Sequence, residues 1–262
     1  MNFFFGISED YIKSQISIPK FQSCGLYDKK IKLYSAEIKN SFWDFKLESS
    51  NETNHFFNIE PNKINSHKIF FVANPNEVER YLDKNKGQTL EDINKFTNTA
   101  PSFRCNLRIF NEKLGYSSYQ SDYPFKMTTK NGSIFSSLYL LTNKNADKNY
   151  LFFRNIFYKP SNELFELYIV DINQKKILDK KKIKSNYSNL IEIKKEFINE
   201  NSYIFTKKYL GIPIYISILD GNFSFEHTHP PHTYILSNRK YEIVGKIKKE
   251  INEIVDKEDT FK

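Results

Sequence analysis

Alternating hydrophobic and polar residues run along much of this chain. Trp43, Phe45 and Leu47 alternate with charged side chains, and Leu107 and Ile109 alternate with polar ones. A period of two is typical of a β-strand with one buried face. The same pattern, together with short apolar runs such as Ile69–Val72, predicts strands over most of the second half of the chain. We expect them near residues 103–109, 134–141, 150–158, 164–170, 175–183, 189–193, 202–209, 212–219 and 223–229.

Turn-forming residues separate these segments. Asn131-Gly132, Asp171-Ile172-Asn173 and Asp220-Gly221-Asn222 all match the composition of tight turns between strands. Many short strands joined by tight turns favour antiparallel sheets over a parallel α/β sheet. We therefore expect a mainly β protein (α+β overall). The expected architecture is an antiparallel β-sandwich or jelly-roll-like sheet with N-terminal α/β decoration and a C-terminal amphipathic helix.

Helical periodicity is confined to a few segments. Asn74-Pro75 matches an N-cap followed by proline at the first helical position, and residues 89–96 suggest a second short helix. Near the end of the chain, Ser237 or Asn238 can cap a helix. Its apolar stripe comprises Tyr241, Val244, Ile247, Ile251 and Ile254.

The polar stretch of residues 97–102 contains a proline and is the best internal boundary. It divides the chain into an N-terminal mixed α/β segment, residues 1–98, and a mainly antiparallel β domain, residues 99–262. The two parts could also form one continuous unit.

Composition narrows the class of protein. The chain has 262 residues, no apolar run long enough for a membrane span, and two cysteines, so we expect a cytoplasmic protein. The formal net charge is +8, but 34 of the 39 basic residues are lysines spread along the chain among acidic residues. Nucleic-acid binders usually concentrate their basic residues on one face, so this distribution does not favour nucleic acid.

Three of the five histidines fall within six residues. His227 and His229 lie two apart, so both side chains project from one face of a strand, and Pro230-Pro231 could turn His232 back toward them. Imidazole ligands suit a divalent zinc, iron or manganese ion. Glu226 could then act as the general acid or base. The alternative is a loop whose imidazoles hydrogen-bond to neighbouring groups.

A second group of candidate residues lies on the strand near residue 107. Arg104, Asn106 and Arg108 share its polar face, and guanidinium groups bind oxyanions through paired hydrogen bonds. The following segment, residues 115–124, is expected to be a loop in which Tyr116, Tyr119 and Tyr123 could stack on a saccharide. A solvated strand face and a packed surface loop are the competing interpretations.

These observations lead to two functional hypotheses, and they leave open whether the protein is an enzyme. The first is a metal-assisted enzyme that acts on a saccharide or another anionic polar small molecule, with the histidines as its metal site. The second is a non-catalytic β-sandwich that recognises a glycan or a protein. The apolar stripe of the last helix also suggests a homo-oligomer formed through that helix.

Overall fold

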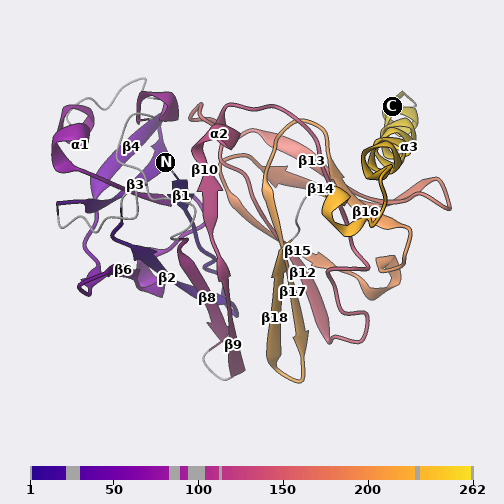
Figure 1. Cartoon of the computed structure of the whole chain (residues 1–262), viewed down its shortest axis with the longest axis horizontal. Coiled ribbons are helices and arrows are strands. Elements are labelled where there is room, and N and C mark those ends of the chain that lie inside the picture. Colours follow the sequence, from indigo (N-terminus) through magenta and orange to yellow (C-terminus); the bar gives the residue numbers. More distant parts are fainter. Residues whose placement is uncertain are drawn as a thin grey trace. The chain divides into compact units, whose positions relative to one another are not determined.

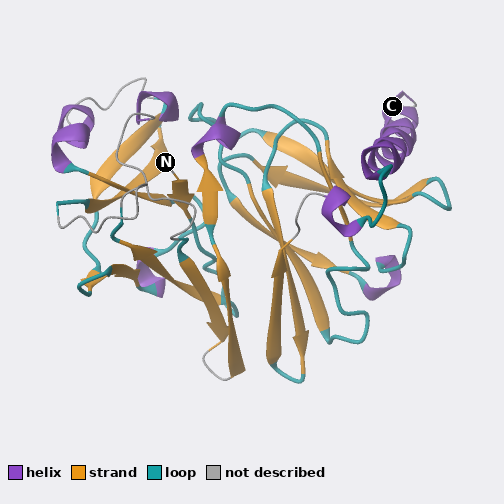
Figure 2. Cartoon of the chain, in the orientation of Figure 1, coloured by secondary structure: helices purple, strands orange, loops and turns teal. Residues whose placement is uncertain are grey.

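The computed structural model describes residues 2–21, 30–82, 89–93, 104–111, 114–227 and 231–260. The chain divides into two compact units. Unit 1 comprises residues 1–130, 155–163 and 185–188, and unit 2 comprises residues 131–154, 164–184 and 189–262. Strands dominate both units (Figure 2), and the described residues form four antiparallel sheets. The mainly β, antiparallel class predicted from the sequence is confirmed, whereas a sandwich or jelly roll does not follow from the strand order.

Unit 1 contains two five-stranded sheets, with strand orders β10-β1-β7-β3-β4 and β5-β6-β2-β8-β9 among the described residues (Figure 1). Its elements are β1 (Asn2–Phe4), β2 (Lys13–Pro19), β3 (Lys32–Lys39), β4 (Phe42–Leu47), β5 (Asn51–Glu52), β6 (Phe56–Ile59), η1 (Pro61–Lys63), β7 (Ile69–Ala73), α1 (Pro75–Leu82), η2 (Leu90–Ile93), β8 (Asn106–Asn111), β9 (Leu114–Gln120), β10 (Asp122–Pro124) and α2 (Phe125–Thr128).

Aromatic side chains form much of the core of unit 1. The rings of Phe3 and Phe71 meet edge to face at 6.1 Å, and Tyr34 stacks on Phe71 at 5.6 Å. The indole of Trp43 is fully buried, and its Nε1–H donates to the carbonyl oxygen of Tyr158 at 2.9 Å. Because buried donors need partners, this bond ties the segment of residues 155–163 into unit 1.

The segment of residues 185–188 is held in unit 1 by a buried asparagine. Asn186 has a positive φ of 52°, and its Nδ2 donates to the carbonyl oxygens of Lys159 and Ser161 at 2.9 and 2.8 Å. Its Oδ1 accepts the backbone N–H of Phe157 at 2.6 Å. Asparagine suits this position because it tolerates the left-handed region and can satisfy several backbone groups at once.

Unit 2 contains two four-stranded sheets, with strand orders β11-β16-β13-β14 and β15-β12-β17-β18 among the described residues. Its elements are β11 (Ile134–Ser137), β12 (Lys148–Arg154), β13 (Leu164–Asp171), β14 (Lys176–Lys184), β15 (Ser188–Ile193), η3 (Lys195–Phe197), β16 (Ser202–Thr206), β17 (Ile212–Leu219), β18 (Asn222–His227), η4 (Pro231–Tyr234) and α3 (Lys240–Thr260). These strands confirm the strand predictions for residues 134–229 to within a few residues at each end.

The turn between β17 and β18 shows why these predictions succeed. Asp220 and Gly221 have φ values of 49° and 76°, the left-handed pair that a two-residue hairpin turn requires. An Asp-Gly pair adopts this conformation at little cost, so the local sequence alone specifies the turn.

The C-terminal helix α3 packs on the sheet that contains β13 and β16 (Figure 1). Ile251 and Val255 are fully buried against Tyr168, Val170 and Phe205. Val244, Ile247 and Ile254 pack against the same cluster while partly exposed. The amphipathic helix predicted from the apolar stripe is therefore confirmed, except that Tyr241, its first member, is exposed.

The N-terminal part of the chain differs from the α/β decoration expected. The described residues of this part form mostly strands, and the described part of the helix suggested over residues 89–96 contains the short 3-10 turn η2. Helix α1 begins at Pro75, as expected, and the Asn74 backbone N–H donates to Glu77 Oε2 at 3.2 Å. The boundary expected between residues 98 and 99 lies outside the described residues. None of the described helices has the length and apolar content needed to cross a membrane.

Candidate ligand-binding face of unit 1

The sheet β5-β6-β2-β8-β9 has one face of buried apolar residues and one polar face. In β2, Ile16 and Ile18 are fully buried, while Gln15 and Ser17 on the opposite face are partly exposed. In β8, Leu107 and Ile109 are buried, while Asn106 and Arg108 are exposed. Because side chains alternate along a strand, the period-two pattern of these segments creates this division.

The register of the five strands aligns neutral polar side chains into one row across the polar face. Asn51 of β5 lies opposite Asn58 of β6, which lies opposite Ser17 of β2. Ser17 also lies opposite Asn106 of β8, which lies opposite Gln120 of β9. We call these five residues the amide row. With neighbouring strands about 4.8 Å apart, the row is roughly 19 Å long.

Hydrogen bonds within the row leave some polar groups available. Ser17 Oγ donates to Asn58 Oδ1 at 2.7 Å, and an Arg104 guanidinium N–H donates to Gln120 Oε1. Asn106 and the nearby Ser118 are exposed, and neither side chain makes a hydrogen bond to another described residue. The middle of the row can therefore donate to and accept from a ligand without breaking internal bonds.

A second line of polar residues runs beside the amide row. Arg108 lies opposite Gln15 on one side and Ser118 on the other. Gln15 Nε2 donates to Glu60 Oε1 at 3.1 Å, and the Arg108 guanidinium lies 5.7 Å from the ring centre of Phe110. The two arginines expected to bind an oxyanion, Arg104 and Arg108, therefore both border the amide row.

A buried acid lies beside Arg104. Burial raises the pKa of Asp122 to about 6, although the Cys105 backbone N–H and the charge of Arg104 oppose the shift. Asp122 Oδ2 is buried and has no hydrogen-bond partner among the described residues. The neighbouring thiol, Cys105 Sγ, lies 2.7 Å from Ser121 Oγ, and burial raises the pKa of this thiol well above its ordinary value. Cys105 is buried and Asp122 is only partly exposed, so this cluster is not one of the exposed groups of the polar face.

The three tyrosines expected to lie on a loop instead belong to strands. Tyr119 pairs with Leu107, so it lies on the apolar face of the sheet and is partly buried. Tyr123 is fully buried in β10, which belongs to the other sheet of unit 1. The backbone of Tyr116 pairs with that of Phe110, and its side chain lies outside the described residues. The structure therefore does not gather the three tyrosines on one surface.

Of the histidines expected to bind a metal, His227 lies at the end of β18, in unit 2. Glu226 is exposed, and His227 lies on the opposite face of the strand because the two residues are adjacent. His232 belongs to η4, where its ring lies 5.0 Å from that of Tyr241. His229 lies outside the described residues.

The metal-assisted enzyme hypothesis is wrong. In the described part of the chain, no three His, Cys, Asp or Glu side chains converge in a way that could hold a metal ion. Glu226 and His227 point to opposite faces, and His232 contacts a tyrosine of α3. The divalent cofactor, with His229 among its ligands, stays an untested prediction.

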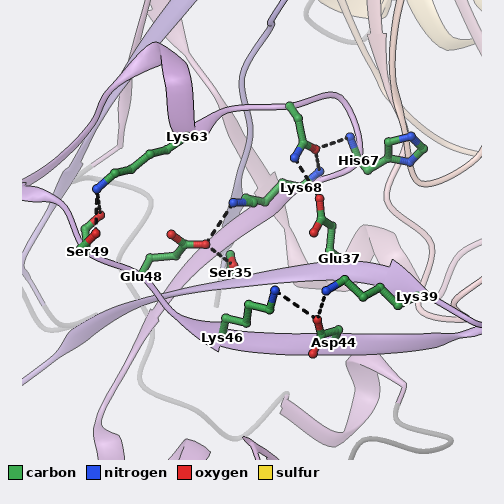
Figure 3. Close-up of polar contacts among 11 residues, drawn as sticks. Ser35, Glu37, Lys39, Asp44, Lys46, Glu48, Ser49, Lys63, His67 and Lys68 are labelled. Atoms are coloured by element: carbon green, nitrogen blue, oxygen red, sulfur yellow. Dashed lines mark hydrogen bonds and ion pairs between the residues drawn. The ribbon is translucent and has the colours of Figure 1, made fainter.

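Unit 1 also carries a network of lysines and carboxylates on β3, β4 and the chain before β7 (Figure 3). Glu48 Oε1 accepts hydrogen bonds from Ser35 Oγ at 2.6 Å and Lys68 Nζ at 3.1 Å. Asp44 Oδ2 lies 2.8 Å from Lys39 Nζ and 3.5 Å from Lys46 Nζ. Because these carboxylates are neutralised by neighbouring lysines, the network is a structural feature rather than a second site.

Comparison with known proteins adds no relative. No protein-family model, curated protein or solved structure matches this chain.

Sequence reasoning identified Arg104, Asn106 and Arg108 but missed the other residues of this face. Gln15, Ser17 and Asn58 lie in short segments where isoleucine or phenylalanine alternates with amide and hydroxyl residues. That alternation was a usable signal for the strands. The alignment into a row depends on the pairing of strands distant in sequence, for which the chain carries no local signal.

Proposed function

We propose that this protein binds an extended, hydroxyl-rich and acidic chain, such as an acidic polysaccharide, on the amide row of unit 1, without catalysing a reaction. The observation that carries the proposal is the alignment of five amide and hydroxyl side chains across five strands, bordered by Arg104 and Arg108.

The chemistry of the amide row supports this ligand class. Amide and hydroxyl groups both donate and accept hydrogen bonds, as sugar hydroxyls do. A guanidinium binds a carboxylate through two parallel hydrogen bonds. The row carries no charge of its own, and Glu60 beside it is engaged by Gln15 and Asn51, each at 3.1 Å. A ligand with both hydroxyls and carboxylates therefore matches the row and its two arginines better than a purely ionic ligand.

The shape of the surface supports an extended ligand. A sheet face presents its side chains on a nearly continuous plane, and the row crosses all five described strands of this sheet. A compact metabolite would contact one or two of its members, whereas a chain of linked sugars could contact most of them. We interpret the apolar face of the same sheet as one half of a β-sandwich, because its buried residues need a second apolar layer.

Binding to named polymers tests the proposal. Titration of the full chain with polygalacturonate should give saturable binding, with weaker binding to the neutral polymer dextran and to polyglutamate, which has carboxylates but no hydroxyls. Asn106→Leu should weaken polygalacturonate binding about tenfold, since a hydrogen bond to a charged or polar partner is worth about 1.5 kcal/mol. Asn145→Leu, at an exposed turn of unit 2, is the matched control and should bind like the unaltered protein.

Arg108→Lys separates geometry from charge. The substitution keeps the positive charge and removes the paired donors, so binding of polygalacturonate should weaken although the net charge of the protein is unchanged. Equal binding of all three polymers, or equal binding by the Asn106 and Asn145 variants, would contradict the proposal.

A further inference from the structure

Unit 2 contains an apolar groove of about 450 Å³ beside the first half of α3. Its lining is mostly aromatic and aliphatic, and it comes from β11 and the turn after it, from β16, from the chain before α3, and from α3. Among the described residues that line it are Phe135, Tyr139, Leu140, Tyr203, Ile235 and Val244. The volume is typical of a binding pocket rather than of a packing defect.

Exposed hydrophobic side chains gather around this groove. Among the large hydrophobic side chains exposed in the described part of the chain, Tyr139, Leu140 and Ile243 line the groove, and Leu236 directly follows a lining residue. Leu236 is fully exposed and directly follows Ile235, which lines the groove. Contiguous apolar surface of this kind marks an interaction site.

The two halves of α3 differ in how well they are covered. In the second half, Ile251 and Val255 are fully buried on the sheet. In the first half, Tyr241 and Ile243 are exposed, and Val244 is partly exposed. The helix therefore presents an uncovered apolar segment to whatever occupies the groove.

We propose that the groove is occupied by a second copy of this chain, related by a twofold axis, with Leu236 of each copy inserted into the groove of the other. A twofold interface uses the same patch on both molecules, so the patch must carry both a projection and a cavity. Leu236 supplies the projection, and the groove beside it supplies the cavity. This interface lies in unit 2 and is independent of the amide row.

The charges of the patch agree with self-association. Glu200 is the charged side chain among the described residues that line the groove, and the first half of α3 carries Lys240 together with Glu242 and Lys246, which lie 3.5 Å apart. A patch with both signs of charge can pair with a copy of itself, because each acidic group can face a basic group of the other copy. Glu200 of one copy can then face the lysines of α3 in the other.

The mass of the protein in solution tests this proposal. Sedimentation equilibrium should detect a dimer, and Leu236→Asp and Leu140→Asp should each weaken dimerisation by at least about 30-fold, the effect of losing a central interface residue. Leu164→Asp is the matched control, because Leu164 is also exposed but lies at the start of β13, outside the lining of the groove. Since Leu140, Leu164 and Leu236 are exposed, unchanged far-ultraviolet circular dichroism and a single cooperative unfolding transition should show that all variants fold.

A crosslink identifies the contact directly. With the photoreactive residue benzoylphenylalanine at position 236, a mixture of nitrogen-15-labelled and unlabelled chains should give crosslinks between the two isotopic forms. Mass spectrometry should map these crosslinks to the groove residues near Tyr139 and Tyr203. A monomeric unaltered protein, a dimer unaffected by Leu236→Asp, or crosslinks confined to one isotopic form would each overturn the proposal.

Discussion

Ser17 Oγ donates a hydrogen bond to Asn58 Oδ1 across the β2–β6 pair at 2.7 Å. The bond fixes the orientation of the Asn58 amide, with its carbonyl oxygen toward Ser17 and its Nδ2 donors free to face a ligand. Two residues of the amide row are thus arranged before any ligand arrives, which reduces the entropic cost of binding.

Ser17→Ala should therefore affect both stability and binding. Loss of the bond should lower the free energy of unfolding by about 1 kcal/mol, as measured by urea denaturation. The freed Asn58 amide should also bind polygalacturonate more weakly. Ser118→Ala is the control, because Ser118 is exposed and makes no hydrogen bond to the described residues. Ser118→Ala should weaken the binding of polygalacturonate and leave the free energy of unfolding unchanged. An equal loss of stability in both variants would contradict the role given to the Ser17–Asn58 hydrogen bond.

The amide row also shows where sequence analysis succeeds and where it stops. Asn106 and Arg108 were identified because they alternate with Leu107 and Ile109 within one strand. Ser17 and Asn58 join them only through strand register, which is set by the packing of the whole sheet. Local pattern therefore predicts which residues share a face of one strand but not which strands become neighbours.

The two units differ in how much their sequences reveal. In unit 2, turns such as Asp220-Gly221 specify hairpins locally, although β11 pairs with the distant β16 and β12 with the distant β17. In unit 1, strands as distant as β1 and β10 or β2 and β8 pair with each other. The polar neighbours of the tyrosines in residues 115–124 resemble turn residues and predict a loop, although β9 and β10 occupy most of this segment.

The pair Glu48–Lys68 in unit 1 should contribute measurably to stability (Figure 3). Both side chains are mostly buried, with exposed fractions of 14% and 17%, and Glu48 also accepts the hydroxyl of Ser35. Glu48→Gln keeps the shape and leaves the Lys68 charge without its counter-ion, so the free energy of unfolding should fall by about 2 kcal/mol.

The control for Glu48 is an exposed pair. Glu196 lies 3.8 Å from Lys194, and both side chains are more than half exposed, so Glu196→Gln should change the free energy of unfolding by about 0–1 kcal/mol. In both variants, the free energy of unfolding measured by urea denaturation should change little between low and high salt. Equal effects of the two substitutions would show that burial does not strengthen the Glu48–Lys68 pair.

Two glycines of unit 2 should respond in opposite ways to alanine. A Cβ at Gly211 would lie 2.3 Å from Phe153 Cζ and 2.8 Å from the carbonyl oxygen of Arg154. Gly211→Ala should therefore destabilise the protein by about 1–3 kcal/mol through overpacking. A Cβ at Gly245, within α3, would have nothing within 4 Å, so Gly245→Ala should stabilise the helix by about 0.5–1 kcal/mol. Thermal unfolding should shift the midpoint down for the first variant and up for the second.

The final prediction concerns the pH dependence of stability that follows from Asp122. Burial raises the pKa of Asp122 from 3.8 to about 6 in the folded chain. The folded protein therefore binds a proton more tightly than the unfolded chain does, and the stabilisation from this group is fully present below pH 3.8. It should be lost as the pH rises through about 6, an effect of ~3 kcal/mol for a shift of this size.

Asp122→Asn keeps the shape and cannot ionise, so the difference between the two proteins in free energy of unfolding isolates Asp122 from the other titrating groups. Urea denaturation at several pH values between 4 and 7 should show the unaltered protein losing stability relative to the variant across this range. A difference that is constant with pH would mean that Asp122 keeps its ordinary pKa and is reached by solvent in the folded chain.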